Sequence, residues 1–447
     1  MKAGGKMVLT ILRSIFSRLY TLIYVFCSMV GTVCTPYTET LPVTADDFEP
    51  AIRFVVFSDA HLVDVGDRTD DPRDGRRVAD MINTVFEIYG DDGIDLFVNC
   101  GDFSEIGTAG QVEQYLEAYN TALNGRAQSI CILGNHDLKT TYKAQEFFRE
   151  NYGLETGEQS ITIKGFHFIA IPSYTQSAIQ IIPESTVIWA AKELKAAEED
   201  SENLPVFTFQ HPHNRGTVYG SGIWGCDSLN KVWEGHSRVV NFSGHSHFPI
   251  SDPRSIWQGS YTAVGAGAMQ RWELEKDIIW GQHPERYDDA AEFWVVEADR
   301  DGSVRMSAYD LNSDTFFLTY YIDNVNDSKT FAYTYKNMEK YDAAPVFDEN
   351  AAAEYAVNEN GEYTLTFDKA TAKLVVQNYK IEVRNKCGLL LKSETYLSDY
   401  YLHDTGDTMT VNLGDLKLDD GEQFTVKIIA CSAYGKQSEA KEFTFNK

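Results

Sequence analysis

Short apolar runs alternate with amphipathic segments along the first half of the chain. Between Asp74 and Gly90, apolar residues recur at helical spacing, so Val78, Ile82 and Val85 would share one face of a helix. Strands that alternate with helices predict an α/β layered domain. The predicted strands are 52–59, 94–102, 128–135, 204–211 and 237–245, with hairpins over 160–171 and 291–311, and the predicted helices are 74–90, 109–125, 142–153 and 185–200.

The pattern changes at about Pro345. Residues 361–367, 378–385, 408–416 and 422–435 alternate apolar and polar positions, with no helical pattern between them. Regular short strands separated by turns predict a C-terminal all-β sandwich. This region, residues 344–447, resembles a fibronectin type III module, most clearly in the stretch VNLGDLKLDDGEQFTVKIIACSAYGKQS. Such modules usually space or present a neighbouring domain, so no chemistry is expected there.

The N-terminus carries a targeting pattern. Four basic residues precede the 16-residue apolar run from Leu19 to Cys34. A basic start before an apolar run of this length predicts an export signal, with a retained membrane anchor as the alternative. The expected destination is outside the cytoplasm: secreted, periplasmic or anchored at the cell surface. The expected organisation is residues 1–34 as signal or anchor, 35–50 as linker, 51–343 as the layered domain and 344–447 as the β-sandwich.

Composition and charge narrow the range of functions. The chain has 447 residues, 43% of them hydrophobic, which is enough to bury more than one core. Its formal net charge of −27 disfavours a long nucleic acid as partner, because binding a phosphate backbone requires basic surfaces. The seven cysteines contain no C-x-x-C pair and suggest neither a zinc cluster nor a disulfide framework. The oligomeric state is left open.

Polar residues that can bind metals follow five of the predicted strands. Their side chains should converge, because ligands gather beyond the carboxyl ends of strands in open α/β sheets. The five tails contain half of the ten histidines in the chain. In chain order they carry Asp59 and His61; Asp102; Asn135, His136 and Asp137; His211; and His245 and His247.

The ordered set D-x-H, G-D, G-N-H-D, H and G-H-x-H resembles the calcineurin-like metallophosphoesterase superfamily over about residues 52–311. The resemblance implies a four-layer fold, in which a two-sheet β-sandwich is flanked by helices and holds two metal ions. It also implies that Asp102 bridges the ions and that His136 is no ligand but faces the leaving-group oxygen, oriented by Asp137. By the same resemblance the first ion takes Asp59, His61 and His247, and the second takes Asn135, His211 and His245.

The residue types suit this chemistry independently of the resemblance. Two divalent ions can clamp the attacking and leaving oxygens of an in-line displacement. Neutral imidazoles with carboxylates suit Mn, Fe or Zn. A metal-bridging hydroxide would then be the nucleophile, since bound cations lower the pKa of water. The chain also lacks a G-x-S-x-G serine motif, which agrees with a reaction that needs no side-chain nucleophile.

Two loops after the metal-binding tails are candidates for substrate contacts. In the stretch QHPH, His211 follows the strand directly and is the favoured ligand, whereas His213 would line the substrate pocket or lie on the surface. The loops 213–225 and 251–261 mix aromatic residues with Arg and Ser. Packing of the loops themselves is the alternative. The candidate substrate contacts are His213, Arg215, Tyr219, Arg254 and Ser255.

These features predict an exported, metal-dependent phosphoric ester hydrolase acting on a small phosphate ester. The sequence does not separate a phosphatase from a phosphodiesterase. The alternative is a non-catalytic cell-surface binding protein built on a phosphoesterase scaffold. Contact with a membrane is expected only through the N-terminal segment.

Overall fold

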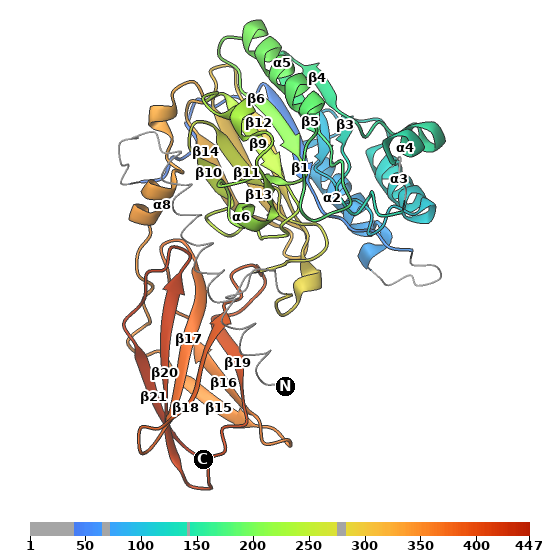
Figure 1. Ribbon diagram of the computed structural model, residues 1–447. Helices are drawn as coiled ribbons and strands as arrows, with labels where there is room; N and C mark the ends of the chain where they lie inside the picture. The colour runs from blue at the N-terminus through green and yellow to red at the C-terminus, as the bar shows by residue number, and fades with distance from the viewer. Residues whose placement is uncertain (1–39, 65–71, 141–143, 275–282) are drawn as a thin grey trace. The chain divides into compact units, whose positions relative to one another are not determined.

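The computed structural model describes residues 40–64, 72–140, 144–274 and 283–447. The predicted signal or anchor, residues 1–34, lies outside the described residues. The described chain forms two compact units (Figure 1). The first contains residues up to 250 together with 254–337, and the second contains 251–253 together with 338–447.

The first unit is built on two six-stranded sheets. The first sheet has the strand order β14-β13-β12-β1-β2-β3, and the second has the order β10-β11-β9-β6-β5-β4. In the first sheet the strands are β1 (Ile52–Phe57), β2 (Leu96–Asn99), β3 (Gln128–Cys131), β12 (Glu292–Ala298), β13 (Val304–Asp310) and β14 (Thr315–Ile322). In the second they are β4 (Gln159–Ile163), β5 (Phe166–Ile171), β6 (Val206–Gln210), β9 (Val239–Ser243), β10 (Ile256–Gln258) and β11 (Thr262–Gly265).

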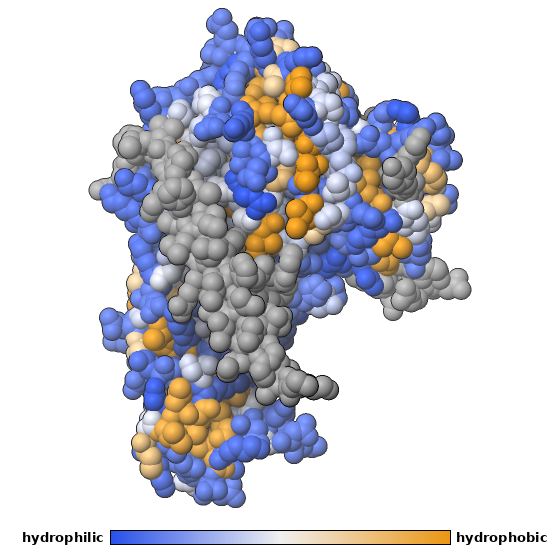
Figure 2. Space-filling view, in the orientation of Figure 1, coloured by the Kyte–Doolittle hydropathy of each residue, from blue (hydrophilic) through white to orange (hydrophobic). Residues whose placement is uncertain are grey.

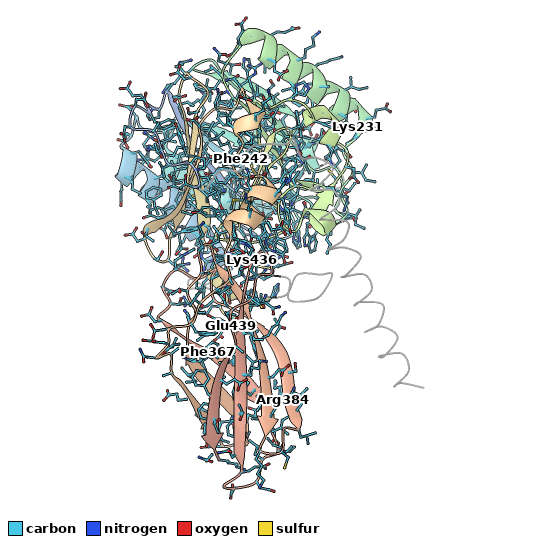
Figure 3. The ribbon with its side chains drawn as sticks, turned by 90° about the vertical axis from the view of Figure 1, so that its left-hand side faces the viewer. Lys231, Phe242, Phe367, Arg384, Lys436 and Glu439 are labelled. Carbon is cyan, nitrogen blue, oxygen red and sulfur yellow. The ribbon has the colours of Figure 1, made fainter. Side chains whose placement is uncertain are left out.

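The two sheets pack face to face through aromatic side chains. Phe54 of β1 contacts Phe168 of β5 and Phe207 of β6, with ring centroids 5.2 Å and 4.6 Å apart. Phe242 of β9 is fully buried and lies inside this unit (Figure 3). Continuous burial on both faces agrees with the unbroken apolar runs of these strands.

Helices cover the outer faces of the sandwich. Val55 and Phe57 of β1 belong to the core that includes helices α2 and α3, and Val206 of β6 belongs to the core that includes α5 and α7. The fold therefore has four layers, helix–sheet–sheet–helix, as predicted. The helices are α2 (Arg76–Tyr89), α3 (Ala109–Leu123), α4 (Ala144–Tyr152), α5 (Glu184–Asp200), α6 (Ser221–Trp224), α7 (Asn230–Trp233) and α8 (Tyr335–Tyr341).

Strand direction brings the predicted tails to one side of the sandwich. Strands β1, β2 and β3 are parallel neighbours in the first sheet. Strands β6 and β9 are parallel neighbours in the second. All five therefore end toward shared edges, where polar side chains can meet.

The second unit is all β. It pairs a three-stranded sheet, β15-β16-β19, with a four-stranded sheet, β18-β17-β20-β21. Its own core includes Leu365, Val383 and Phe424. The strands are β15 (Ala353–Val357), β16 (Tyr363–Asp368), β17 (Val376–Asn385), β18 (Leu390–Leu397), β19 (Thr408–Gly414), β20 (Gln423–Ser432) and β21 (Lys441–Asn446).

Candidate metal centre

The tails leave their strands through unusual backbone conformations. Ten residues other than glycine have positive φ in the described chain, and five of them lie in the predicted tails. Such conformations cost on the order of 1–3 kcal/mol each and concentrate at functional sites. The five are Asp59 (57°), His61 (45°), Asp102 (54°), His245 (74°) and His247 (54°).

The first group of converging side chains contains Asp59, His61, Asp102 and His247, all buried. Nε2 of His247 lies 3.1 Å from Oδ1 of Asp59 and 3.0 Å from Nε2 of His61. Nε2 of His61 lies 3.7 Å from Asp59 Oδ1 and 3.8 Å from Asp102 Oδ2. Four nitrogen and oxygen atoms thus point at one small volume.

The second group contains Asp102, His211 and His245, so Asp102 belongs to both groups. Nε2 of His211 lies 3.1 Å from Oδ2 of Asp102 and 3.2 Å from Oδ1 of Asn135. The structure thus brings all seven residues predicted as metal ligands into two adjoining groups, with Asp102 between them.

Each histidine of these groups has one ring nitrogen held by an oxygen outside the cluster. Such partners fix the tautomer and the ring orientation of a metal-binding histidine. Because carbonyls and carboxylates accept hydrogen bonds, the held nitrogen donates and the other keeps its lone pair. The contacts are His61 Nδ1 with Glu105 Oε2 (3.1 Å), His211 Nδ1 with Cys100 O (2.9 Å), His245 Nε2 with Ala178 O (2.9 Å) and His247 Nδ1 with Arg271 O (3.1 Å).

The cluster suits cations. Asp59 Oδ1 and Asp102 Oδ2 are buried and have no hydrogen-bond partner in the described structure. Buried carboxylate oxygens that face imidazole lone pairs at about 3 Å are stabilised by a positive charge between them. Two carboxylates, four imidazoles and an amide oxygen are a donor set that suits Mn, Fe or Zn. The site is therefore suited to two metal ions.

Electrostatics in the cluster agree with this fit. Burial alone would raise the pKa of Asp59, but His247, with His61 and His211, lowers it well below the usual value. A proton competes with metal for the same place. Burial lowers the pKa of His211, but the Asp102 carboxylate outweighs burial and raises that pKa to about 9. Burial and the nearby His211 lower the pKa of His245 to about 4, so that ring is neutral.

Two glycines of the motifs are required by close approach. A Cβ on Gly134 would overlap the carboxylate and backbone nitrogen of Asp102. A Cβ on Gly244 would overlap Ser58 Oγ and Asp59 Oδ2. The glycines in G-N-H-D and G-H-x-H therefore let one tail lie directly against another.

Comparison with known proteins agrees with this geometry. Residues 52–249 match the family model of calcineurin-like phosphoesterases. Over these residues the chain is similar to calcineurin-like phosphoesterases. A search of curated proteins found no significant match.

Several solved structures resemble this chain at low identity. A purple acid phosphatase from yellow lupin (Lupinus luteus) seeds matches 64% of this chain and 55% of its own, at 12% identity and a TM-score of 0.43. The sulfate thiohydrolase SoxB of Thermus thermophilus matches 69% of this chain and 64% of its own, at 11% identity and a TM-score of 0.35. A two-domain fibronectin type III segment of chicken tenascin matches 35% of this chain and 71% of its own, at 10% identity and a TM-score of 0.17. At these TM-scores, none of the three structures adds evidence about the fold or function of this chain.

His136 lies beside the metal groups, but its orienting partner is Glu105. The Nδ1 atom of His136 lies 2.9 Å from the carbonyl oxygen of Glu105 and 3.3 Å from its carboxylate. Asp137 instead accepts hydrogen bonds from the backbone nitrogens of Asp102, Ser104 and Gly134. The prediction that Asp137 orients His136 is therefore wrong. Its buried carboxylate joins the tails of β2 and β3.

Sequence reasoning missed three residues around His136. Glu105 contacts both His61 and His136, and Arg271 pairs with Glu105 at 3.1 Å. The Nζ atom of Lys139 lies 2.7 Å from Nδ1 of His136. Glu105 follows the G-D motif by three residues, a position that could have been noticed. Arg271 lies in none of the motifs, so nothing in the sequence around it indicates a place at the site.

His213 does not line the site. Its side chain is buried, with Nδ1 2.7 Å from Ser243 Oγ and Nε2 2.7 Å from Ser246 Oγ. Both nitrogens are thus engaged, and burial, followed by the nearby His245, lowers the pKa of His213 to about 3. The prediction of a substrate contact is wrong here, because the ring supports the turn that carries His245.

The remaining four candidates for substrate contacts are engaged with neighbouring residues or with the other loop. Arg215 bonds to the carbonyl oxygens of Gly222 and Gly225 and to Asp227. The hydroxyl of Ser255 is buried and donates to the carbonyl of Ile250. The guanidinium of Arg254 stacks 3.5 Å from the ring centroid of Tyr219. These contacts favour the alternative that the two loops pack against themselves.

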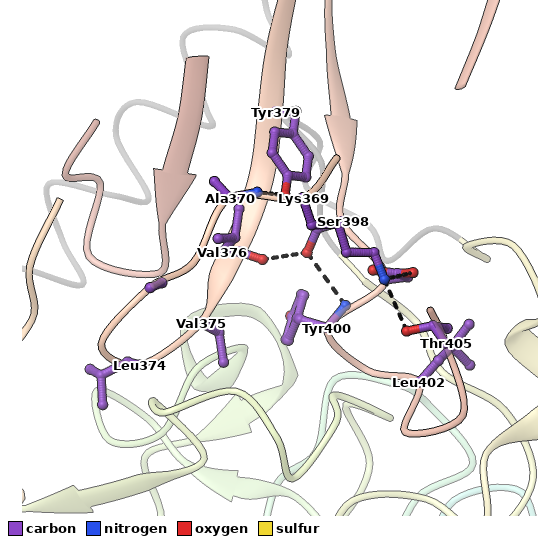
Figure 4. Close-up of a pocket in the computed structure, with 12 residues that line it drawn as sticks. Lys369, Ala370, Leu374, Val375, Val376, Tyr379, Ser398, Tyr400, Leu402 and Thr405 are labelled. Atoms are coloured by element: carbon purple, nitrogen blue, oxygen red, sulfur yellow. Dashed lines mark hydrogen bonds and ion pairs between the residues drawn. The ribbon is translucent and has the colours of Figure 1, made fainter. Parts of the chain in front are cut away.

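A pocket of about 280 Å³ lies in the second unit (Figure 4). Its polar groups bond to one another: Lys369 Nζ lies 2.7 Å from Asp399 and 3.0 Å from Thr405 Oγ1. None of its lining residues belongs to a group that could hold a metal. In the described part of the chain, no helix combines the length and apolar character that a membrane span requires.

Proposed function

We propose that this domain hydrolyses a small phosphomonoester or phosphodiester by metal-assisted in-line displacement. The observation that carries the proposal is the pair of buried oxygens, Asp59 Oδ1 and Asp102 Oδ2, that lack hydrogen-bond partners among the described residues and face imidazole nitrogens. The match of residues 52–249 to the calcineurin-like phosphoesterase family model supports the reaction class.

The proposed ligand sets follow the two groups described above. When bound, two divalent ions supply Lewis-acid stabilisation of the phosphoryl oxygens and lower the pKa of water. Asp102 would contribute to both ligand sets. Asp59, His61 and His247 complete one set, and Asn135, His211 and His245 complete the other.

His136 is the proposed proton donor to the leaving oxygen. Its side chain remains 18% exposed, so it can reach a substrate. Burial lowers its pKa, but the hydrogen bond to Glu105 and the charges of Asp102 and Glu105 outweigh burial and raise the pKa above the usual value. The Glu105 contacts therefore favour the protonated imidazole, and Nε2 would release the proton, since Nδ1 faces Glu105.

The test is a hydrolysis screen of purified protein with nitrophenyl monoesters and diesters, with Mn, Fe and Zn added separately. We expect metal-dependent hydrolysis of at least one ester class, and no hydrolysis by the Asp102→Ala variant under the same conditions. Metal-loaded protein that cleaves neither class would contradict the proposal.

We further propose that the protein is exported. The support is the basic segment before the apolar run from Leu19 to Cys34. Cell fractionation of the full chain and of a variant beginning at Thr35 tests this. Recovery of both in the cytoplasm would contradict export.

A further inference from the structure

Two carbonyl groups that hold histidines of the site are each followed by an exposed isoleucine. The carbonyl of Glu105 faces His136 Nδ1 at 2.9 Å, and the next residue, Ile106, is 39% exposed. The carbonyl of Ala178 faces His245 Nε2 at 2.9 Å, and the next residue, Ile179, is 64% exposed. In the chain, an exposed apolar residue thus directly follows each of two carbonyls that contact histidines of the candidate metal site.

The loop that carries Ile179 is uncharged. Residues 172–183 contain no Asp, Glu, Lys or Arg, although 23% of the whole chain is charged. Ile181 is 65% exposed, while Gln180 between them is buried. An exposed pair of isoleucines in an uncharged loop is costly in water unless something covers it.

The same loop is anchored at both ends. The backbone nitrogen of Ser173 donates to Leu133 O at 2.7 Å, and that of Ile182 donates to Ser228 Oγ at 3.1 Å. Ile182 itself is buried in the core of the second sheet. The exposed isoleucines are therefore presented from a fixed loop. Figure 2 shows a band of hydrophobic surface on the first unit beside α5.

Trp224 adds an aromatic ring to this side of the site. Its ring centroid lies 5.3 Å from that of His245, edge to face. His245 therefore contacts both the Ala178 carbonyl, which Ile179 follows, and an indole ring. A substrate whose phosphate reaches the metal groups would place its organic part near these side chains.

We propose that Ile106, Ile179 and Ile181 form an apolar rim that binds the hydrophobic alkyl or aryl group of the substrate ester. The inference rests on the proposed phosphoesterase function and names its substrate class. It selects amphiphilic phosphate esters over esters of sugars, whose hydroxyl groups would lose hydrogen bonds to water against an apolar rim.

Binding of alkylphosphonates to the metal-loaded protein tests the rim without requiring hydrolysis. Methyl-, butyl- and octylphosphonate carry the same anionic group and differ in apolar length. A fully buried CH₂ contributes about fourfold in affinity, so with partial burial we expect octylphosphonate to bind about 10- to 100-fold more tightly than methylphosphonate. Calorimetry below the micellar concentration measures each Kd.

The Ile179→Ser/Ile181→Ser double variant should reduce the octyl-to-methyl Kd ratio to within about threefold of unity. Ile88→Ser is the matched control, because Ile88 is 43% exposed on α2, and it should keep the wild-type ratio. Each ratio is taken within one metal-loaded preparation, which cancels differences in loading.

Equal Kd values for octyl- and methylphosphonate in the wild type would overturn the rim, as would a double variant that keeps the wild-type ratio. A third outcome would also overturn the rim. In it, the wild type binds phosphatidylcholine vesicles and the double variant does not, while the Kd of the phosphonates does not depend on chain length. That result would favour contact with a membrane. Failure of the proposed hydrolysis is a separate result, because a length-dependent Kd without turnover would leave the rim standing.

Discussion

Asp102 is shared by the two groups that contain the predicted metal ligands, whereas a third group of possible ligands, His61, Glu105 and His136, does not include it. Asp102→Ala should reduce the metal content from two ions per chain to nearly none, because the remaining ligands would bring two cations close together with no carboxylate between them. Elemental analysis of purified protein measures this. Asp420→Ala, at a side chain that is 99% exposed, is the control and should keep both ions. Two ions retained in Asp102→Ala would refute the bridging position.

His136 is expected to move a proton and to hold no metal. His136→Ala should keep both ions while its rate falls by about 10²–10⁴-fold on an alkyl ester, whose alkoxide leaves poorly without a proton. A nitrophenyl ester should lose much less, since nitrophenolate leaves unprotonated. Rates on both esters, with metal content, provide the measurement. Equal losses on the two esters would assign His136 another role.

Glu105 contacts two histidines with different expected roles. In the native protein, the Glu105 carboxylate contacts His61 Nδ1 and also raises the pKa of His136. Glu105→Gln removes that negative charge. We expect metal affinity to fall about 10- to 100-fold, as for other partners of metal-binding histidines. The alkyl ester should also lose more rate than the nitrophenyl ester. Glu150→Gln, at an exposed residue of α4, should change neither quantity. Unchanged metal affinity in Glu105→Gln would show that His61 keeps its orientation unaided.

The positions of the seven expected ligands could be predicted from the sequence, because each follows an apolar strand within a few residues. Glu105 lies close to the G-D motif, but its contacts with His61, His136 and Arg271 could not be assigned from the sequence, since they arise only when distant segments meet. The expectation that His213 contacts the substrate fails for a related reason. It follows the same strand as His211, and only the packed structure shows that Ser243 and Ser246 bind its ring.

At the scale of elements, the buried carboxylate of Asp137 accepts hydrogen bonds from the tails of both β2 and β3. Asp137 accepts hydrogen bonds from Gly134 N, Asp102 N and Ser104 N, each at 2.9 Å. Asp137→Asn would turn an amide N–H₂ toward backbone N–H groups. We expect a loss of about 1–3 kcal/mol in the free energy of unfolding, from the buried donors left unpaired.

Denaturant unfolding of metal-free protein measures this loss, so that changes in metal binding do not contribute. Asp227→Asn is the matched control, because the Asp227 side chain is 73% exposed and should tolerate the change. Wild-type stability in Asp137→Asn would mean that the tails of β2 and β3 do not depend on this carboxylate.

The long elements of the first unit agree with the alternation in the sequence, including α5, predicted over 185–200 and found at Glu184–Asp200. Shorter strands escaped prediction. Ile256–Gln258 was interpreted as part of a substrate loop, but it pairs with Thr262–Gly265 at the edge of the second sheet. Three-residue strands carry too little periodicity to be distinguished from loops, and their neighbours in the sheet decide their conformation.

At the scale of the whole molecule, each of the two units has its own hydrophobic core. Every residue in the two candidate metal groups lies before Ile250. A variant ending at Ala343 should therefore bind two ions and keep phosphoesterase activity within about threefold of the full chain. Activity per bound metal is the measurement. A soluble, metal-loaded variant without activity on an ester that the full chain cleaves would show that residues 344–447 contribute to the site.

The five left-handed residues in the tails bear on how the protein behaves before it acquires metal. Ligand bonds would hold Asp59, His61, Asp102, His245 and His247 in conformations that their backbones disfavour. Without those bonds, the loops should open more often, while the strands they follow stay closed. Amide hydrogen exchange should therefore be fast in these loops in chelated protein and slow after metal is added. The speed of that exchange would then report how much of a preparation is loaded, even when no substrate is known.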